Sequence, residues 1–182
     1  LNLSIDVDSQ IDLNILNHLG NADGMPLIVD AETFASLQNL QSFALPQGIV
    51  VRDSSGDVAE LLSRNSLDSR IVGVESLSGD LTLNVSQLNN FRTLISTSDV
   101  ILQDSGAAIS EYFTSGTDFT GIKSVGVTNG DILQLSANAF ANLSSLGSDS
   151  NYSVNVEIVD SQDAIASHFP SGQTLDDRIK SF

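Results

Sequence analysis

The chain has 182 residues, with 23 acidic against 7 basic side chains, a formal net charge of -16 and no cysteine. A hydrophobic content of 41% beside a charged content of only 16% excludes an intrinsically disordered chain, which needs the opposite balance. Without cysteine there are no disulfides, thiolate metal ligands or cysteine nucleophiles. The negative charge makes nucleic acid and anionic lipid unfavourable partners, and no apolar run approaches the ~20 residues of a membrane-spanning helix, so we predict neither nucleic-acid binding nor membrane insertion.

Three aspartates lie close together near the start of the chain, at Asp6, Asp8 and Asp12. On a strand, alternate residues project to the same face, so Asp6 and Asp8 present two carboxylates to a hard cation, for which Ca²⁺ is the candidate. The alternative interpretation is a solvated strand edge that its charges keep soluble. We assign these three residues as candidate metal ligands and predict no other cofactor.

The first recurring segment begins with two aliphatic residues that flank one other residue. Its copies are 27–40, 81–94 and 133–146. Each aliphatic pair is followed by a polar residue (Asp30, Asn84 or Ser136) and then by apolar residues at three-residue steps. The alternation predicts a short strand, and the change to steps of three or four predicts a helix with one buried stripe. The polar residue at the change is predicted to be the helix N-cap.

A second recurring segment ends in Asp-Ser and also predicts a strand followed by a helix. Its copies are 49–54, 100–105 and 156–161, and a weaker one surrounds Asp8. Apolar residues stand five and nine positions after each aspartate of the three full copies. We predict that Asp53, Asp104 and Asp160 cap the following helices, in preference to a metal-ligand role, because the capping preference of aspartate explains the pattern by itself.

A third segment is short and rich in β-branched residues. Its copies are 71–75 and 122–127. Turn residues follow both copies, Gly79-Asp80 in the first and Asn129-Gly130-Asp131 in the second. We therefore predict a strand, a tight turn built on glycine and then the next strand. Two further stretches, 68–73 and 177–182, mirror each other as the starts of such strands.

Successive copies of the first segment are 54 and 52 residues apart, which predicts a single repeat array over residues 1–182. The predicted units are 1–46, 47–97, 98–150 and 151–182, of which the last is incomplete. Because one strand and one helix are too small to bury their own apolar faces, neighbouring units must stack, as in a solenoid. We predict an α/β fold with one long, mostly parallel sheet and helices packed against it. The alternative is a closed globular α/β domain that retains an internal duplication.

Residues with catalytic chemistry are few. The two histidines, His18 and His168, both stand where predicted helices end, which favours helix termination over catalysis. The sequence has no His-x-x-x-His zinc pair, glycine-rich phosphate loop or Gly-x-Ser-x-Gly nucleophile elbow. Paired carboxylates leave a glycan-active enzyme as the catalytic hypothesis, but the aromatic content is 5% and tryptophan is absent, so stacking platforms for sugars are scarce. We therefore predict a protein that is not an enzyme.

The alternation of aliphatic-x-aliphatic-x-Asp-Ser segments, as at 49–54, with Leu-x-Leu-Asn/Ser segments, as at 81–84, resembles the tandem repeats of very large secreted or cell-surface bacterial proteins. Those proteins are adhesin-like or surface-layer-like, and some of them, of the RTX type, carry calcium-binding nonapeptide arrays. The resemblance implies an extracellular or cell-surface location and carries over no active-site residues. The glycine-rich nonapeptide itself does not occur in this sequence.

The functional prediction is a structural or adhesive repeat segment that extends a larger surface protein or serves it as a binding module. Its expected partners are neighbouring repeats of the same parent chain, together with a cell-surface glycan or protein. The first alternative is a self-assembling, surface-layer-like scaffold stabilised by calcium. The second is the carboxylate-based glycan-active enzyme.

Overall fold

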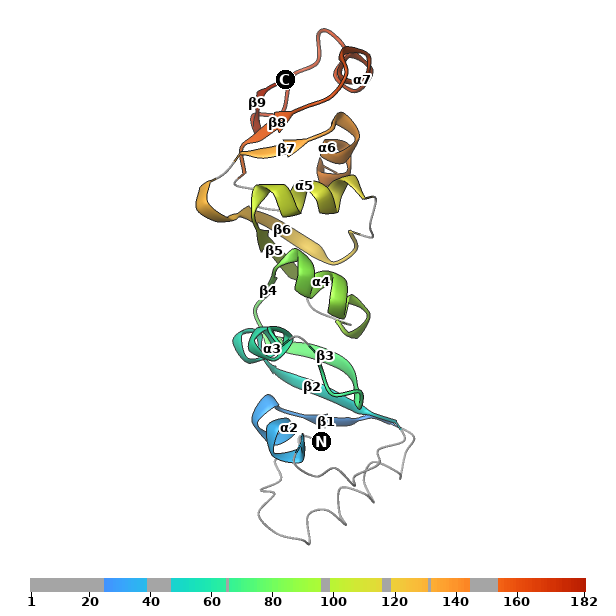
Figure 1. The fold of residues 1–182 in the computed structure, drawn as a ribbon, viewed down its shortest axis with the longest axis vertical. Helices are drawn as coiled ribbons and strands as arrows, with labels where there is room; N and C mark the ends of the chain where they lie inside the picture. The colour runs from blue at the N-terminus through green and yellow to red at the C-terminus, as the bar shows by residue number, and fades with distance from the viewer. Residues whose placement is uncertain are drawn as a thin grey trace, which may run out of the picture. The chain divides into compact units, whose positions relative to one another are not determined.

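The computed structural model describes most of the chain in seven stretches. They are residues 25–38, 47–64, 66–95, 99–115, 119–130, 132–144 and 154–182. The chain divides into two compact units, Leu1–Leu81 with Asn90–Ser98 and Thr82–Asn89 with Asp99–Phe182. Each unit is described by itself, and the labels of the helices and strands are those of Figure 1.

The first unit contains a parallel sheet of three strands connected by two helices. The strands are β1 (Leu27–Val29), β2 (Ile49–Ser54) and β3 (Ile71–Ser78), in that spatial order, and the helices are α2 (Ala31–Gln38) and α3 (Ser55–Leu62). The register pairs Ile49 of β2 with Leu27 on one side and with Ile71 on the other. Both helices pack against β2, and their apolar side chains Phe34 and Leu62 are completely buried. The 3-10 helix η1 (Arg92–Leu94) also lies against β3.

The second unit holds most of the other two sheets, which are also parallel and three-stranded. One sheet has the order β4 (Leu81–Leu83), β5 (Val100–Asp104), β6 (Ile122–Val127), and the other has the order β7 (Leu133–Leu135), β8 (Val156–Ile158), β9 (Ile179–Ser181). The helices that follow these strands are α4 (Val85–Phe91), α5 (Gly106–Thr114), α6 (Ala137–Ser144) and α7 (Gln162–His168), with a 3-10 turn η2 (Thr128–Gly130) before β7. Helix α5 packs against β7 and α6, as Figure 1 shows.

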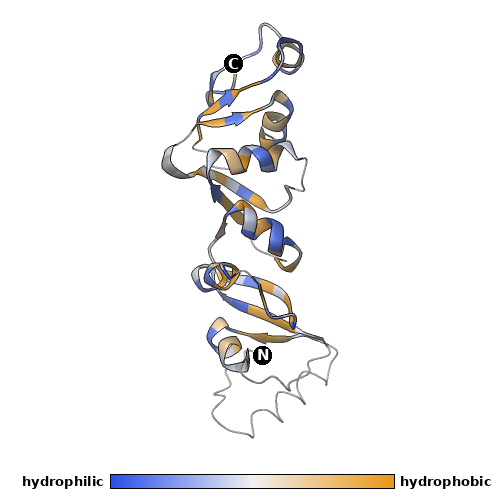
Figure 2. Ribbon diagram, in the orientation of Figure 1, coloured by the Kyte–Doolittle hydropathy of each residue, from blue (hydrophilic) through white to orange (hydrophobic). Residues whose placement is uncertain are grey.

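The three sheets share one order of elements: strand, helix, strand, helix, strand. We call the stretches 27–78, 81–127 and 133–181 the first, middle and last blocks. Several strands of these blocks alternate hydrophobic and hydrophilic residues. Figure 2 shows this in β7 and β8, where a hydrophilic residue stands between two hydrophobic ones. The outer two residues of β7, Leu133 and Leu135, are buried and the central Gln134 is exposed, which is the alternation a strand requires. The predicted α/β fold of alternating strands and helices is confirmed.

The prediction of one long sheet is wrong, because the described strands form three separate sheets. A parallel neighbour needs a crossover of about a dozen residues or more. Only Gly79 and Asp80 separate β3 from β4, and Gly79 takes a φ of +76°. The chain can turn a corner there, but β4 cannot return to lie parallel beside β3. Apart from its pairing with β2, β3 makes an isolated parallel bridge between Val74 and Ile95. Gly130, with a φ of +68°, stands in the corresponding turn before β7 and confirms the predicted glycine turn.

The blocks are offset from the predicted repeat units. Each block takes its first strand from one predicted unit and its second and third strands from the next. The first block, for example, combines β1 of unit 1–46 with β2 and β3 of unit 47–97. The offset arises because a periodic sequence does not show at which residue a structural unit begins. The sheets do show it, since each one is completed by three consecutive strands.

Candidate functional site

The helix that follows the first strand of each block begins at the predicted cap. Asp30 accepts a hydrogen bond from the backbone N–H of Thr33 (2.6 Å), and Asn84 accepts one from Gln87 (2.8 Å). In the last block, the hydroxyl of Ser136 accepts from the N–H of Ala139 (3.1 Å). At α4 the Gln87 side chain returns the contact by accepting from the N–H of Asn84 (2.9 Å), which completes a capping box. The capping prediction for the first series is confirmed.

The caps of the second series are different from the prediction. The N-cap of α3 is Ser54, that of α5 is Ser105 and that of α7 is Ser161. Each serine hydroxyl accepts from the N–H three residues later, at 3.3 Å. The assignment of Asp53, Asp104 and Asp160 as caps was therefore wrong by one residue. Serine is as good a cap as aspartate, so the cap preference does not decide between two adjacent candidates.

The aspartates of the second series instead join two neighbouring helices. One carboxylate oxygen accepts from the N–H of the serine that follows, at 2.7 Å for Asp53, 2.7 Å for Asp104 and 2.8 Å for Asp160. The other oxygen accepts from the first residue of the preceding helix, which is Ala31 (3.0 Å), Val85 (3.0 Å) or Ala137 (3.1 Å). Each carboxylate therefore lies where two helices begin, and the partial positive charge at a helix N-terminus favours an anion there. A structural role accounts for all three aspartates.

An aspartate–arginine ion pair stands just before the third strand in two of the blocks. Asp68 accepts from the backbone N–H of Arg70 (2.9 Å) and from its guanidinium (2.9 and 2.6 Å). Asp176 and Arg178 make the same set of contacts before β9. The hydrogen bonds from the guanidinium lower the pKa of each aspartate below its ordinary value, and the same contact raises the pKa of Arg70. Asp176 is therefore the structural equivalent of Asp68. The alignment of 68–73 with 177–182 in the sequence had paired Asp68 with Asp177, one residue later.

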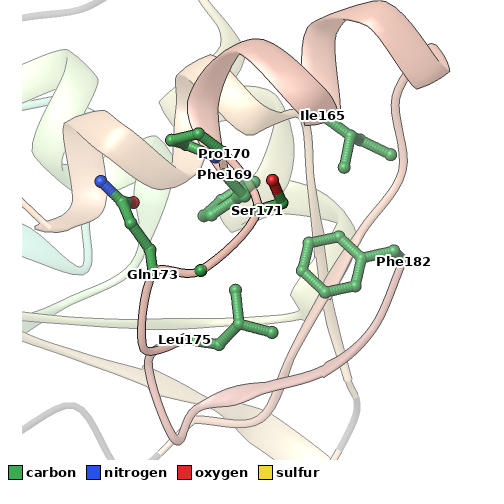
Figure 3. A pocket seen from close by; sticks show the side chains of 8 residues that line it. Ile165, Phe169, Pro170, Ser171, Gln173, Leu175 and Phe182 are labelled. Carbon is green, nitrogen blue, oxygen red and sulfur yellow. The ribbon is translucent and has the colours of Figure 1, made fainter.

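An open apolar site lies between α7 and the end of β9. A hollow of about 280 Å³ is lined there by Ile165, Phe169, Pro170, Leu175 and Phe182, together with the polar Ser171 and Gln173. Figure 3 shows Ile165 and Phe182 on one side of it and Leu175 below them. The Phe169 ring contacts those of Phe182 (centroids 5.4 Å apart) and Phe140 (5.9 Å).

The same register positions are buried in the other two blocks. Ile165 corresponds to Val58 and Ile109, each five residues after its aspartate, and both of these are 0% exposed. Phe169 corresponds to Leu62 and Phe113, which are also 0% exposed. Phe182 follows Ile179 by three positions, as Val74 follows Ile71 and Val125 follows Ile122, and it is 52% exposed where the two valines are 0% and 2% exposed.

The middle block shows what covers these positions. Helix α5, which carries Ile109 and Phe113, packs against β7 and α6 of the last block. The hydroxyl of Ser110 on α5 also donates to the backbone oxygen of Gln134 in β7. The Phe113 ring stacks on that of Phe119, and the Tyr112 ring meets both of them edge-on. The first strand and helix of the last block, β7 and α6, therefore pack against the second helix of the middle block.

The predicted metal ligands Asp6, Asp8 and Asp12 lie outside the described residues, as does His18. Within the described residues, no group of three or more metal-ligating side chains is placed to hold an ion. His168 is the last residue of α7, where its Nδ1 lies 3.0 Å from the backbone oxygen of Ala164. That position confirms the prediction of helix termination for His168.

No family model, curated protein or solved structure matches the chain. None of the helices in the described ranges combines the length and the apolar character that a membrane crossing requires.

The sequence interpretation missed the hollow at α7 and β9, although a signal for it was present. Aligning Ile179 with Ile71 and Ile122 places Phe182 at a position where the other blocks carry a core valine. A large aromatic residue at that place, beside Ile165 and Phe169, predicts an apolar surface that needs a cover.

Proposed function

We propose that the chain is a non-catalytic structural segment of a larger extracellular or cell-surface protein, in which successive blocks stack as an array and extend the molecule or present it for binding. The observation that carries this proposal is the packing of α5 against β7 and α6, in which one block is completed by the next. An isolated strand–helix half would leave Ile109 and Phe113 in water, whereas both are 0% exposed here. Burying such side chains contributes about 1.5–3 kcal/mol each, so the interface between blocks is a large part of what keeps α5 folded.

The aspartates that join neighbouring helices support the same function. Asp53, Asp104 and Asp160 each take two backbone N–H groups, and the acids of the second series are thereby used to hold helices together. Repetition of one backbone arrangement at three places is typical of an array whose units were built alike. It offers no reaction chemistry, because both oxygens of these carboxylates serve the fold.

The extracellular setting is proposed from composition and from the resemblance to repeats of giant bacterial surface proteins. A net charge of -16 with 7 basic residues leaves many carboxylates facing solvent, which suits a surface bathed in salt or divalent cations. The partners that fit this setting are neighbouring repeats and a cell-surface glycan or protein. Labelling of the intact producing cells with an impermeant reagent tests the location. Protection of this segment until the cells are lysed would contradict it.

The array itself is tested by amide hydrogen exchange of the unmodified protein in increasing urea. Stacked blocks open separately, because each contacts only its neighbours. We therefore expect the exchange rates of the slowest amides in β2 and β3 to depend on urea concentration differently from those in β7 and β8. A single dependence shared by all of the slow amides would instead indicate one closed globular domain.

A further inference from the structure

We propose that the hollow between α7 and β9 is the docking site for the first strand and helix of a further repeat in the same polypeptide. The occupant is a segment of the type seen at 133–144: two leucines flanking a polar residue, a cap, small residues and a phenylalanine. The inference rests on the proposed function, because it assigns to the last block the same acceptor surface that the middle block uses within the array.

The lining residues of the hollow stand at the register of core residues. Ile165, Phe169 and Phe182 occupy positions that are fully or almost fully buried in the other blocks. Phe182 is nevertheless 52% exposed, and Leu175 beside it is 45% exposed. Side chains of this size at core positions, gathered around one hollow, mark a surface built to be covered.

The middle block shows which elements such a surface packs against. Helix α5, which carries the equivalent residues Ile109 and Phe113, packs against β7 and α6. On α6 the residues Ala137, Ala139 and Leu143 are each at most 1% exposed. Small side chains let the backbone of α6 approach α5 closely, and a segment with the same pattern fits α7 for the same reason.

The polar contacts at the two surfaces differ in one respect. Ser110 of α5 donates to the backbone of β7, and the same position of α7 is Ala166. Docking on α7 therefore depends on apolar contact with Ile165, Phe169 and Phe182 and lacks that hydrogen bond. Substitution of the exposed Phe182 is for this reason the sharpest way to weaken the site.

The experiment appends residues 126–146 directly after Phe182 in the full chain, because Phe182 stands at the register position of Val125. The added copy then begins its strand at the same distance from β9 as β7 does from β6. We expect the amides of α7 to exchange at least about tenfold more slowly. The free energy of burying one phenylalanine or isoleucine side chain is large enough to slow opening by that factor. A higher Tm with unchanged monomeric mass accompanies this result.

Two matched variants control for nonspecific effects. The first carries Leu→Asp at the appended equivalent of Leu135, and the second carries Phe182→Ser in the acceptor. Both are expected to restore the exchange rates of the unextended chain. Appended residues that leave the α7 exchange unchanged would overturn the docking site, while the separate urea dependences of the blocks would still support the array. A dimer of the unextended chain that Phe182→Ser abolishes would place a second copy in the hollow and also overturn the proposal.

Discussion

The carboxylate of Asp104 accepts a hydrogen bond from the backbone N–H of Val85, 19 residues earlier in the chain, at 3.0 Å. Its other oxygen accepts from Ser105, the cap of the next helix. A single side chain at the end of β5 thus fixes the starts of α4 and α5, and Asp53 and Asp160 do the same in their blocks. The strand–helix halves of a block are joined at this point by a charge between two helix N-termini.

Replacing Asp104 with alanine is expected to lower the free energy of unfolding by about 1–3 kcal/mol, because two backbone N–H groups lose a charged acceptor. Urea denaturation followed by circular dichroism measures the change. The matched control is Asp99→Ala. Asp99 is 63% exposed and lies 3.7 Å from Lys123, so its removal should change stability by less than about 0.5 kcal/mol. Equal effects of the two variants would argue against a joining role for Asp104.

Replacing Ser105 with alanine should cost about 1 kcal/mol, because the N–H of Ala108 loses its side-chain acceptor. Ser105→Asn keeps an acceptor at the same position and should retain most of the stability. The same denaturation measurement compares the two variants. If alanine and asparagine proved equally stable at this position, the cap would lie elsewhere.

The pairs Asp68–Arg70 and Asp176–Arg178 predict a specific response to acid. The arginine lowers the pKa of each aspartate in the folded chain below the unfolded value of 3.8. The stabilisation is therefore fully present above that unfolded value and is lost as the pH falls through the lower, folded pKa. The double variant Arg70→Gln, Arg178→Gln should be less stable than the unmodified protein at neutral pH.

That difference in stability should shrink as the pH is lowered below the ordinary pKa of aspartate. Urea denaturation at a series of pH values measures it, and the double variant Lys123→Gln, Lys180→Gln, at two more exposed lysines, controls for the loss of two positive charges. A difference that stayed constant down to the most acidic condition would show that the two aspartates are not the titrating groups.

Replacing Gly79 with alanine should destabilise the chain by about 1 kcal/mol or more, because its φ of +76° is unfavourable for any residue with a Cβ. The added Cβ would also stand 3.3 Å from the Ser55 hydroxyl. Gly130→Ala has a similar φ of +68° but no atom within 4 Å, so it should cost less. Gly56→Ala, in helix α3, should instead stabilise slightly. Thermal denaturation ranks the three, and a stabilising Gly79→Ala would contradict the turn.

Much of the fold follows from local sequence patterns. The pair Leu133 and Leu135 followed by Ser136 predicts a strand, a cap and a helix, and all three occur. These features depend on contacts between residues a few positions apart, which a periodicity reports directly. The single long sheet did not follow, because the placement of β4 in another sheet depends on the two-residue link after β3 and not on any strand's own pattern.

Contacts between distant residues were the least predictable. Asp53 precedes a helix, and aspartate is a residue type that often caps helices. Only the hydrogen bond from Ala31, 22 residues earlier in the sequence, shows that Asp53 contacts two helices. Phe182 is a single aromatic residue in the sequence, and its exposure beside Ile165 becomes significant only when the equivalent Val74 and Val125 are seen to be buried.

The packing of the last block against α5 of the middle block is tested most directly at Phe113. Its side chain is 0% exposed, and its helix α5 packs against β7 and α6. Phe113→Ala should cost about 3–5 kcal/mol, and the milder Phe113→Leu provides a variant that stays folded if the alanine does not. Phe169→Ala, at the same register position of the more open α7, should cost less.

Segment-resolved amide exchange of the Phe113 variants gives the most direct answer. We predict faster exchange in α5, β7 and α6 together, with the amides of β1 and α2 unchanged, because the damage spreads only to the block in contact. Faster exchange in α5 alone would show that the next block does not depend on it. Faster exchange throughout the chain would show one cooperative globular domain, and either result would contradict the stacked array.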